Sequence, residues 1–144
     1  SVFLQGTTRF LNDKAGEALH HGFESILHGV AAAHGCAAEI TWHEGYPITF
    51  NAPEAHATWK EISESTFGAD RVHTMDPVMG GEDFSYYGQK IPACFFALGL
   101  LPEGQDAMPG LHHPCFDFND AAIPMGIEAF VALATNTGSR KSGG

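Results

Sequence analysis

The sequence predicts an α/β fold in which short strands alternate with amphipathic helices. Residues 1–10 are rich in β-branched and aromatic side chains with partial alternation, which is typical of a strand. Residues 13–34 repeat apolar side chains every three or four positions, as a helix does, and residues 38–42 read as a second strand. This strand–helix–strand order resembles half of a small ferredoxin-like unit, which cannot close a core on its own.

The first helix has clear signals at both ends. Asn12 or Asp13 offers an N-cap, and Gly35 is a suitable residue to end the helix. Its apolar stripe consists of Ala15, Leu19, Phe23, Ile26, Leu27 and Val30.

The second half of the chain repeats the alternation. Asn51, followed by Pro53 and Glu54, predicts a helix that runs to about Phe67 and ends at Gly68. The remaining expected elements are a short strand at 71–75, a buried strand at 92–98 and a last amphipathic helix from 120 to about 136.

These patterns divide the chain into three regions. The break at Gly45-Tyr46-Pro47 indicates a boundary near residue 50, so that residues 1–50 and 51–138 belong to different domains. Residues 139–144 have the composition of a disordered tail. The chain starts at Ser1 within a strand-like pattern, which we interpret as a segment of a longer protein.

Composition excludes several functional classes. Seven Lys and Arg against 17 Asp and Glu give a net charge of −10, so we expect neither nucleic acid nor anionic lipid as a partner. No stretch approaches the roughly 18 apolar residues that a membrane span needs. Three well-separated cysteines argue against a disulfide framework and favour a reducing, cytoplasmic location.

The densest polar cluster is the segment 111–120. His112 and His113 precede a Pro and a helix, and neutral imidazole is a good zinc ligand. Adjacent histidines on a loop are also commonly exposed and inert, and Cys115 beside a Phe is commonly a packing residue. A self-contained metal site of His112, His113, Cys115 and Asp117 is a further hypothesis, although its donors are crowded into six residues.

A second cluster lies in the glycine-hinged segment 79–84. Glu82 and Asp83 could orient a substrate or a metal ligand there, although a turn with solvated acids has the same composition. Arg9 is the only basic residue of the first strand and could bind a carboxylate, although the residues alone favour an ordinary surface Arg. The HExxH, GxSxG, P-loop and GxGxxG motifs are absent from the sequence.

Four motifs, taken in order, resemble one family of enzymes. They are GTTRF (6–10), the Gly-Tyr-Pro turn (45–47), MGGEDFSYY (79–87) and LHHPCFDFND (111–120). The chain resembles, from about residue 5 to 136, the metal-dependent amidohydrolases that include hippurate hydrolase, N-acyl-amino-acid amidohydrolases and auxin-conjugate hydrolases. These are related to aminoacylase and to carboxypeptidase of the co-catalytic zinc type.

The resemblance implies a specific place in a larger fold. Residues 1–50 would form the second half of a ferredoxin-like lid that also makes the dimer interface. Residues 51–138 would form the C-terminal part of the catalytic α/β domain. His112 matches the family's C-terminal metal ligand, whereas Arg9, Glu82 and Asp83 match positions with a substrate-binding or positioning role.

The resemblance also implies an activity for the full-length protein. That activity is hydrolysis of the amide of an N-acyl amino acid by a homodimer with a dinuclear zinc or manganese centre, which activates a water while a Glu shuttles the proton. The family's Cys-x-His motif, Glu-Glu pair and middle His ligand have no counterpart in these 144 residues, so this segment alone is expected to be inactive. The alternative is a catalytically inert interaction module that dimerises through its first strand and helix.

Overall fold

A computed structural model of the chain describes residues 1–138, which fall into two compact units. Unit 1 comprises Ser1–Phe50 and Met75–Ile91, and unit 2 comprises Asn51–Thr74 and the chain from Pro92 onward. One division coincides with the predicted boundary near residue 50. The assignment of residues 1–50 and 51–138 to two domains of a larger protein stays a prediction, and the predicted tail lies outside the described residues.

Helix α1 (Asp13–Ala33) dominates unit 1 and begins and ends as the sequence predicts. The side chain of Asn12 accepts a hydrogen bond of 2.8 Å from the Ala15 N–H, which is N-cap geometry. At the other end Gly35 has a φ of 67°, and the Cys36 N–H donates to the Ala31 carbonyl at 2.8 Å. These are the features of a Schellman ending, which favours glycine because its φ is positive.

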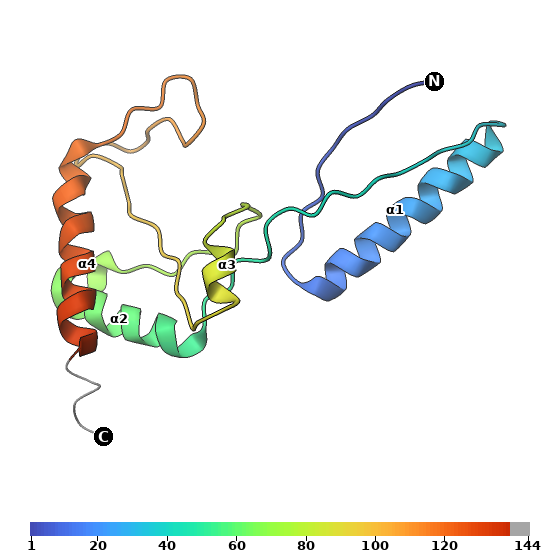
Figure 1. Ribbon diagram of the computed structural model, residues 1–144. Coiled ribbons are helices and arrows are strands. Elements are labelled where there is room, and N and C mark those ends of the chain that lie inside the picture. The colour runs from blue at the N-terminus through green and yellow to red at the C-terminus, as the bar shows by residue number, and fades with distance from the viewer. Residues whose placement is uncertain (139–144) are drawn as a thin grey trace. The chain divides into compact units, whose positions relative to one another are not determined.

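The segment that follows α1 runs back along the helix (Figure 1). Trp42 stacks on His20 with ring centroids 4.1 Å apart, and its indole N–H donates to the Glu24 carboxylate at 2.7 Å. Phe10 also meets His20 edge-on and lies against Gly16, a buried residue of α1. Aromatic stacking and one hydrogen bond therefore fix this segment on α1, in place of a β-ladder.

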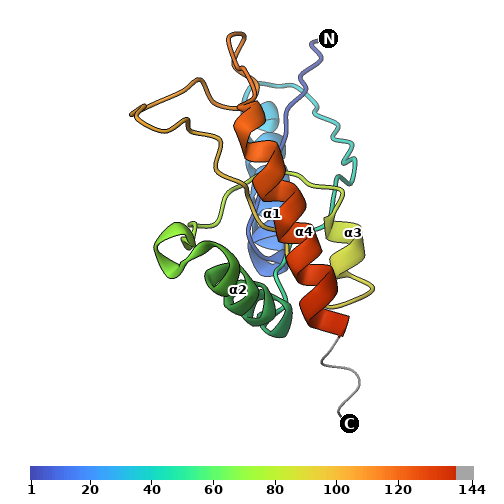
Figure 2. The same ribbon diagram turned by 90° about the vertical axis from the view of Figure 1, so that its left-hand side faces the viewer.

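Unit 2 is built on two helices that pack against each other, α2 (Pro53–Phe67) and α4 (Ile123–Gly138) (Figures 1 and 2). Short 3₁₀ turns, Ala69–Arg71 and Asp120–Ala122, follow α2 and precede α4. The buried apolar side chains of the described residues all lie in this unit: Ile62, Ala93, Ala122, Ala129 and Ala132. Four of these five are alanines, so the core is small and the helices approach closely.

The helix predictions are confirmed, but the strand predictions are wrong for residues 1–138. Residues 1–10, 38–42, 72–75 and 92–98 form no β-ladder, and Arg71 belongs to a 3₁₀ turn. A strand needs a neighbouring strand to satisfy its backbone groups. In the described residues that neighbour is missing: Ala93 and Phe95 bond instead to the Ala52 N–H and to the side chain of Asn51. An α/β fold is therefore not formed within residues 1–138, which consist of helices joined by extended chain.

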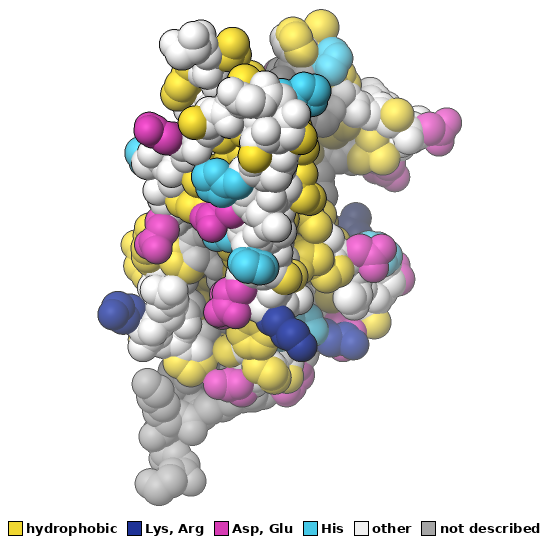
Figure 3. Space-filling view, turned by 90° about the vertical axis from the view of Figure 1, so that its right-hand side faces the viewer, with side chains coloured by type: hydrophobic (Ala, Val, Ile, Leu, Met, Phe, Trp, Pro, Cys, Tyr) yellow, Lys and Arg dark blue, Asp and Glu magenta, His cyan; other side chains and the backbone are white. Residues whose placement is uncertain are grey.

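Many large apolar side chains remain exposed, as the yellow areas among polar side chains in Figure 3 show. Val2, Phe3 and Leu4 are each more than 80% exposed. In the described part of the chain no helix combines the length and the apolar character that crossing a membrane requires.

Candidate functional site

Unit 1 brings Arg9 together with the glycine-hinged acidic loop. A Cβ placed on Gly81 would lie 3.0 Å from Arg9 Nη1 and 3.5 Å from the Tyr46 ring, so both side chains touch this glycine. Glu82 and Asp83, the next two residues, are exposed. The structure therefore places three of the predicted site residues in one neighbourhood: Arg9, Glu82 and Asp83.

The acidic loop is held by hydrogen bonds at its C-terminal end. The carbonyl of Glu82 accepts from both the N–H of Ser85, at 3.1 Å, and its hydroxyl, at 2.6 Å. Ser85 is only 2% exposed and opens the short helix α3 (Ser85–Gly88). The Tyr86 N–H donates to the Asp83 carbonyl at 3.1 Å, so the backbone at both acids is fixed while their carboxylates face solvent.

His112, the predicted metal ligand, lies on an exposed loop of unit 2. Its φ of 68° is the one positive value among the non-glycine residues at positions 1–138. The left-handed region costs an ordinary residue on the order of 1 kcal/mol, although His adopts it more readily than most. His112 lies inside the turn that the His113 N–H closes on the Gly110 carbonyl, and a second turn, closed by the Phe116 N–H on the His113 carbonyl, follows it.

The two adjacent histidines differ in what their rings do. Nδ1 of His113 accepts a hydrogen bond of 3.0 Å from the Cys115 N–H, which leaves the proton of the neutral ring on Nε2. Within residues 1–138 the ring of His112 has no hydrogen-bond partner, so both of its nitrogens are open to an external ligand. The ring of His112 is thus unbonded in the described residues, whereas the ring of His113 is hydrogen-bonded within its own turn.

No group of three or more His, Cys, Asp or Glu side chains that could hold a metal ion forms within the described residues. A closed zinc site needs four donors, and a catalytic site needs three. The set His112, His113, Cys115 and Asp117 does not provide them, so the hypothesis of a self-contained site has no support in the structure. Taken alone, the donors present do not fit a metal centre.

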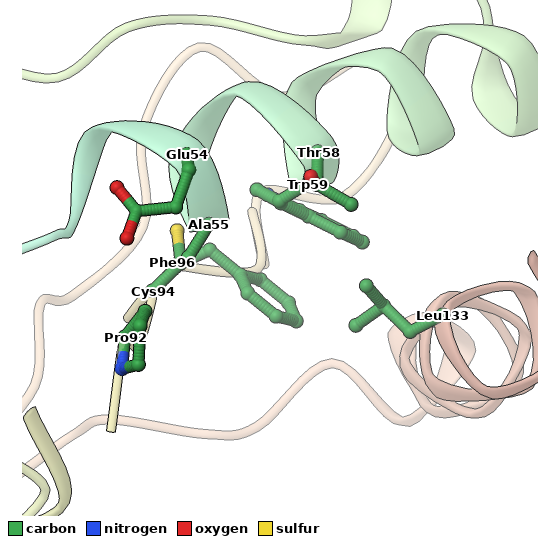
Figure 4. A pocket seen from close by; sticks show the side chains of 8 residues that line it. All are labelled: Glu54, Ala55, Thr58, Trp59, Pro92, Cys94, Phe96 and Leu133. Carbon is green, nitrogen blue, oxygen red and sulfur yellow. The ribbon is translucent and has the colours of Figure 1, made fainter. Parts of the chain in front are cut away.

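A pocket of about 370 Å³ lies in unit 2 between α2, residues 92–96 and α4 (Figure 4). The stacked rings of Trp59 and Phe96 face Leu133 across it. Burial raises the pKa of the Cys94 thiol at its wall, which makes this thiol a poorer nucleophile than an exposed cysteine. None of the predicted site residues lines the pocket, which is completed by Glu54, Ala55, Thr58 and Pro92.

The sequence did not predict the contacts that Tyr46 makes with Gly81 and Tyr86. Its ring lies against Gly81 and meets Tyr86 edge-on, with centroids 6.0 Å apart, so it links the 45–47 turn to the acidic loop and α3. The signal was present in the Gly45-Tyr46-Pro47 motif, but a turn motif does not tell which distant segment its aromatic ring will contact.

Several curated proteins are similar to this chain. YhaA of Bacillus subtilis is 34% identical over 83% of the chain and 30% of its own length. IAA-amino acid hydrolase ILR1-like 4 of Arabidopsis thaliana is 30% identical over 94% of the chain and 32% of its own length. N-acetyldiaminopimelate deacetylase of a Geobacillus species is 31% identical over 94% of the chain and 35% of its own length.

The chain therefore spans about a third of the length of these relatives. No solved structure gives a significant match. The profile of peptidase family M20/M25/M40 matches residues 3–136, which is nearly the whole chain. Peptidases of this family are generally metal-dependent. On this match the chain belongs to the M20/M25/M40 peptidase family, a family of hydrolases.

Proposed function

We propose that the full-length protein hydrolyses the amide bond of N-acyl amino acids in a metal-dependent reaction, and that this chain supplies one metal ligand and part of the substrate pocket. Two similar proteins support this substrate class by their names, an IAA-amino acid hydrolase and an N-acetyldiaminopimelate deacetylase. On this proposal the chain is the C-terminal part of the enzyme, and alone it is inactive.

The observation that carries the proposal is the state of His112. Its backbone has a left-handed conformation within the turn from Gly110 to His113, and its exposed ring has no partner in the described residues. Strained positions of this kind tend to cluster at functional sites. An exposed, unbonded ring on a backbone that a turn holds is suited to bind a metal that the rest of the protein also holds.

The metal would be zinc or manganese, both of which accept imidazole and carboxylate ligands. Because the described residues gather no group of three donors and the proposal assigns only His112 to the metal, the other ligands and the general base would belong to the remainder of the protein. No catalytic step can therefore be assigned to the described residues, whose part is to bind the metal and the substrate.

Arg9, Glu82 and Asp83 are proposed to contact the substrate. Arg9 makes no ion pair or hydrogen bond within residues 1–138, so its guanidinium is available to the carboxylate of an amino acid product or substrate. Glu82 and Asp83 supply negative charge on a fixed backbone, which would orient a polar group or a ligand of the metal.

Residues 1–50 are proposed to belong to a lid through which the full-length protein forms a homodimer. The exposed Val2, Phe3 and Leu4 supply an apolar extended segment suited to such an interface. The location would be cytoplasmic, consistent with the three free cysteines of the chain.

The experiment is a substrate panel assayed with the full-length, metal-loaded protein. N-acetyl, N-benzoyl and indole-acetyl amino acids would be compared with dipeptides and with simple esters, by measuring release of the amino group. The proposal expects turnover of at least one N-acyl amino acid and its loss on chelation. Turnover confined to dipeptides or esters would contradict it.

The second candidate is an inert module that dimerises through the same exposed N-terminal segment. The exposure of Val2, Phe3 and Leu4 favours it as much as it favours a lid. Sedimentation of the 144-residue chain separates the two when combined with the panel above. A stable dimer whose full-length form hydrolyses nothing would support the module.

A further inference from the structure

The side chain of Arg9 rests on a glycine. Its Nη1 atom lies 3.0 Å from the point where a Cβ on Gly81 would be, which is tighter than almost all real Cβ contacts. Arg9 itself is exposed and has no ion pair within the described residues. The guanidinium is therefore placed by contact with the loop, while its hydrogen-bonding atoms remain available.

Glycine at position 81 is needed for space and not for backbone conformation. The positive-φ glycines of the described chain are Gly35, Gly68 and Gly104, so Gly81 has a backbone that other residues can also adopt. A side chain here would meet Arg9 Nη1, which would have to move, and would make an ordinary contact with the Tyr46 ring at 3.5 Å. Arg9 Nη1 and the Tyr46 ring thus both border Gly81. We call Gly81, together with the Tyr46 ring beside it, the seat of the guanidinium.

The seat is attached to a fixed part of unit 1. Tyr46 meets Tyr86 edge-on, and the Tyr86 N–H bonds to the Asp83 carbonyl. The buried Ser85 holds the Glu82 carbonyl by two hydrogen bonds. A guanidinium that rests on Gly81 consequently lies against a loop whose backbone is fixed, although its own side chain is long and flexible.

We propose that Gly81, with Tyr46, is a positioning residue that sets where Arg9 presents its guanidinium, and thereby sets the preference for substrates with a free α-carboxylate. This inference rests on the proposed function for the role of Arg9. It adds a determinant that binds no substrate itself and acts through the Arg9 side chain. Because the obstructing atom is the end of a flexible side chain, a methyl group at 81 would shift the guanidinium and leave the fold intact.

The chain offers a matched control for this test. A Cβ on Gly80 would meet only Glu82 Oε1, at 3.7 Å, which is an ordinary contact. Gly81→Ala and Gly80→Ala therefore add the same methyl group to neighbouring positions, and only the first reaches Arg9. Both variants would be made in the full-length, metal-loaded protein.

The kinetic readout is KM for an N-acyl amino acid and for its C-terminal amide. We expect Gly81→Ala to raise KM for the free acid about 3- to 10-fold with kcat within 2-fold, since a few tenths of an ångström weakens a bidentate contact. The amide should change less, and Gly80→Ala should change neither. Equal changes for acid and amide would overturn the positioning role.

A double variant tests whether Gly81 acts through Arg9. With Arg9→Ala already in place, the obstructing atom is gone, so adding Gly81→Ala should leave KM for the free acid unchanged. Additive effects of the two substitutions would show that Gly81 acts by another route and would refute the proposal.

A readout without activity separates this inference from the proposed function. Phenylglyoxal modification of Arg9, mapped by mass spectrometry with Arg71 as internal reference, should be faster in Gly81→Ala than in wild type or Gly80→Ala. An unchanged rate would contradict the contact between Arg9 and Gly81. A faster rate in a protein that hydrolyses no N-acyl amino acid would retain the seat and refute its role in substrate binding.

Discussion

Asn51 and Phe95, 44 positions apart, are joined by two hydrogen bonds that run in opposite directions. The Asn51 side-chain N–H donates to the Phe95 carbonyl at 2.9 Å, and the Phe95 N–H donates to the Asn51 side-chain oxygen at 2.7 Å. The carboxamide thereby satisfies both backbone groups of Phe95, as a neighbouring strand would. It ties the segment 92–98 to the start of α2 within unit 2.

Replacing Asn51 by Ala should lower the free energy of unfolding of the 144-residue chain by about 1–2 kcal/mol, because both bonds are lost together. Asn51→Asp is the matched control. It keeps the acceptor for the Phe95 N–H but puts a carboxylate oxygen against the Phe95 carbonyl, so it should also destabilise the chain. Urea denaturation followed by circular dichroism would measure both, and equal stability of wild type and Asn51→Ala would contradict the account.

The two tryptophans report on different units, since Trp42 lies in unit 1 and Trp59 in unit 2. The buried apolar side chains of residues 1–138 are confined to unit 2, so that unit should resist denaturant better. In Trp59→Phe, fluorescence follows unit 1 and should change at lower urea than in Trp42→Phe, which follows unit 2. Coincident transitions would show that the units unfold as one.

Cys94 should be the least reactive of the three free thiols. Burial raises its pKa, so at pH 8 it carries less thiolate than an exposed cysteine. Iodoacetamide labelling mapped by mass spectrometry should modify Cys36 and Cys115 first, and urea should remove the difference. Preferential labelling of Cys94 in the folded chain would contradict this assignment.

The raised pKa of Cys94 also predicts a pH dependence of the free energy of unfolding. A pKa raised in the folded state means that the unfolded chain loses its thiol proton first as pH rises. The contribution of Cys94 is therefore complete below the ordinary thiol pKa and is lost as pH rises through the raised value. Cys94→Ala should remove this part of the alkaline decline in the unfolding midpoint, and Cys36→Ala should not.

Arg9→Ala in the full-length protein should raise KM roughly 10- to 100-fold for substrates with a free carboxylate, as expected for loss of a charge-assisted contact. Amidated substrates should be affected less, and Arg71→Ala, an exposed Arg of unit 2, should affect neither. Equal effects of Arg9→Ala on KM for the acid and for the amide would contradict the proposal that Arg9 binds the carboxylate.

The sequence was sufficient for the helices and their ends because those signals are local. The Asn12 cap, the Gly35 ending and Pro53 at the first turn of α2 depend only on nearby residues, and all three appear in the structure. Strands depend on a distant partner, which local patterning cannot supply. Residues 92–98 have the composition of a buried strand, yet Asn51 and Ala52 take up its backbone groups and Phe95 stays partly exposed.

The distinction between local signals and long-range contacts also applies to the candidate site. His112 could be named from its motif, and so could Arg9 and the two acids. The contact of Arg9 and Tyr46 with Gly81 joins three segments that are far apart in sequence, so no local pattern predicted it. The different states of the two adjacent histidine rings also appeared only with the turn that His113 makes with Cys115.

The most direct test of the account is the metal content of the full-length protein with His112→Ala and, as control, His113→Ala. Mass spectrometry of metals after gel filtration would give equivalents of zinc and manganese per protomer. If His112 is a ligand, His112→Ala should lose about one equivalent and nearly all amidohydrolase activity, whereas His113→Ala should keep both. Full metal content and unchanged turnover in His112→Ala would contradict the account.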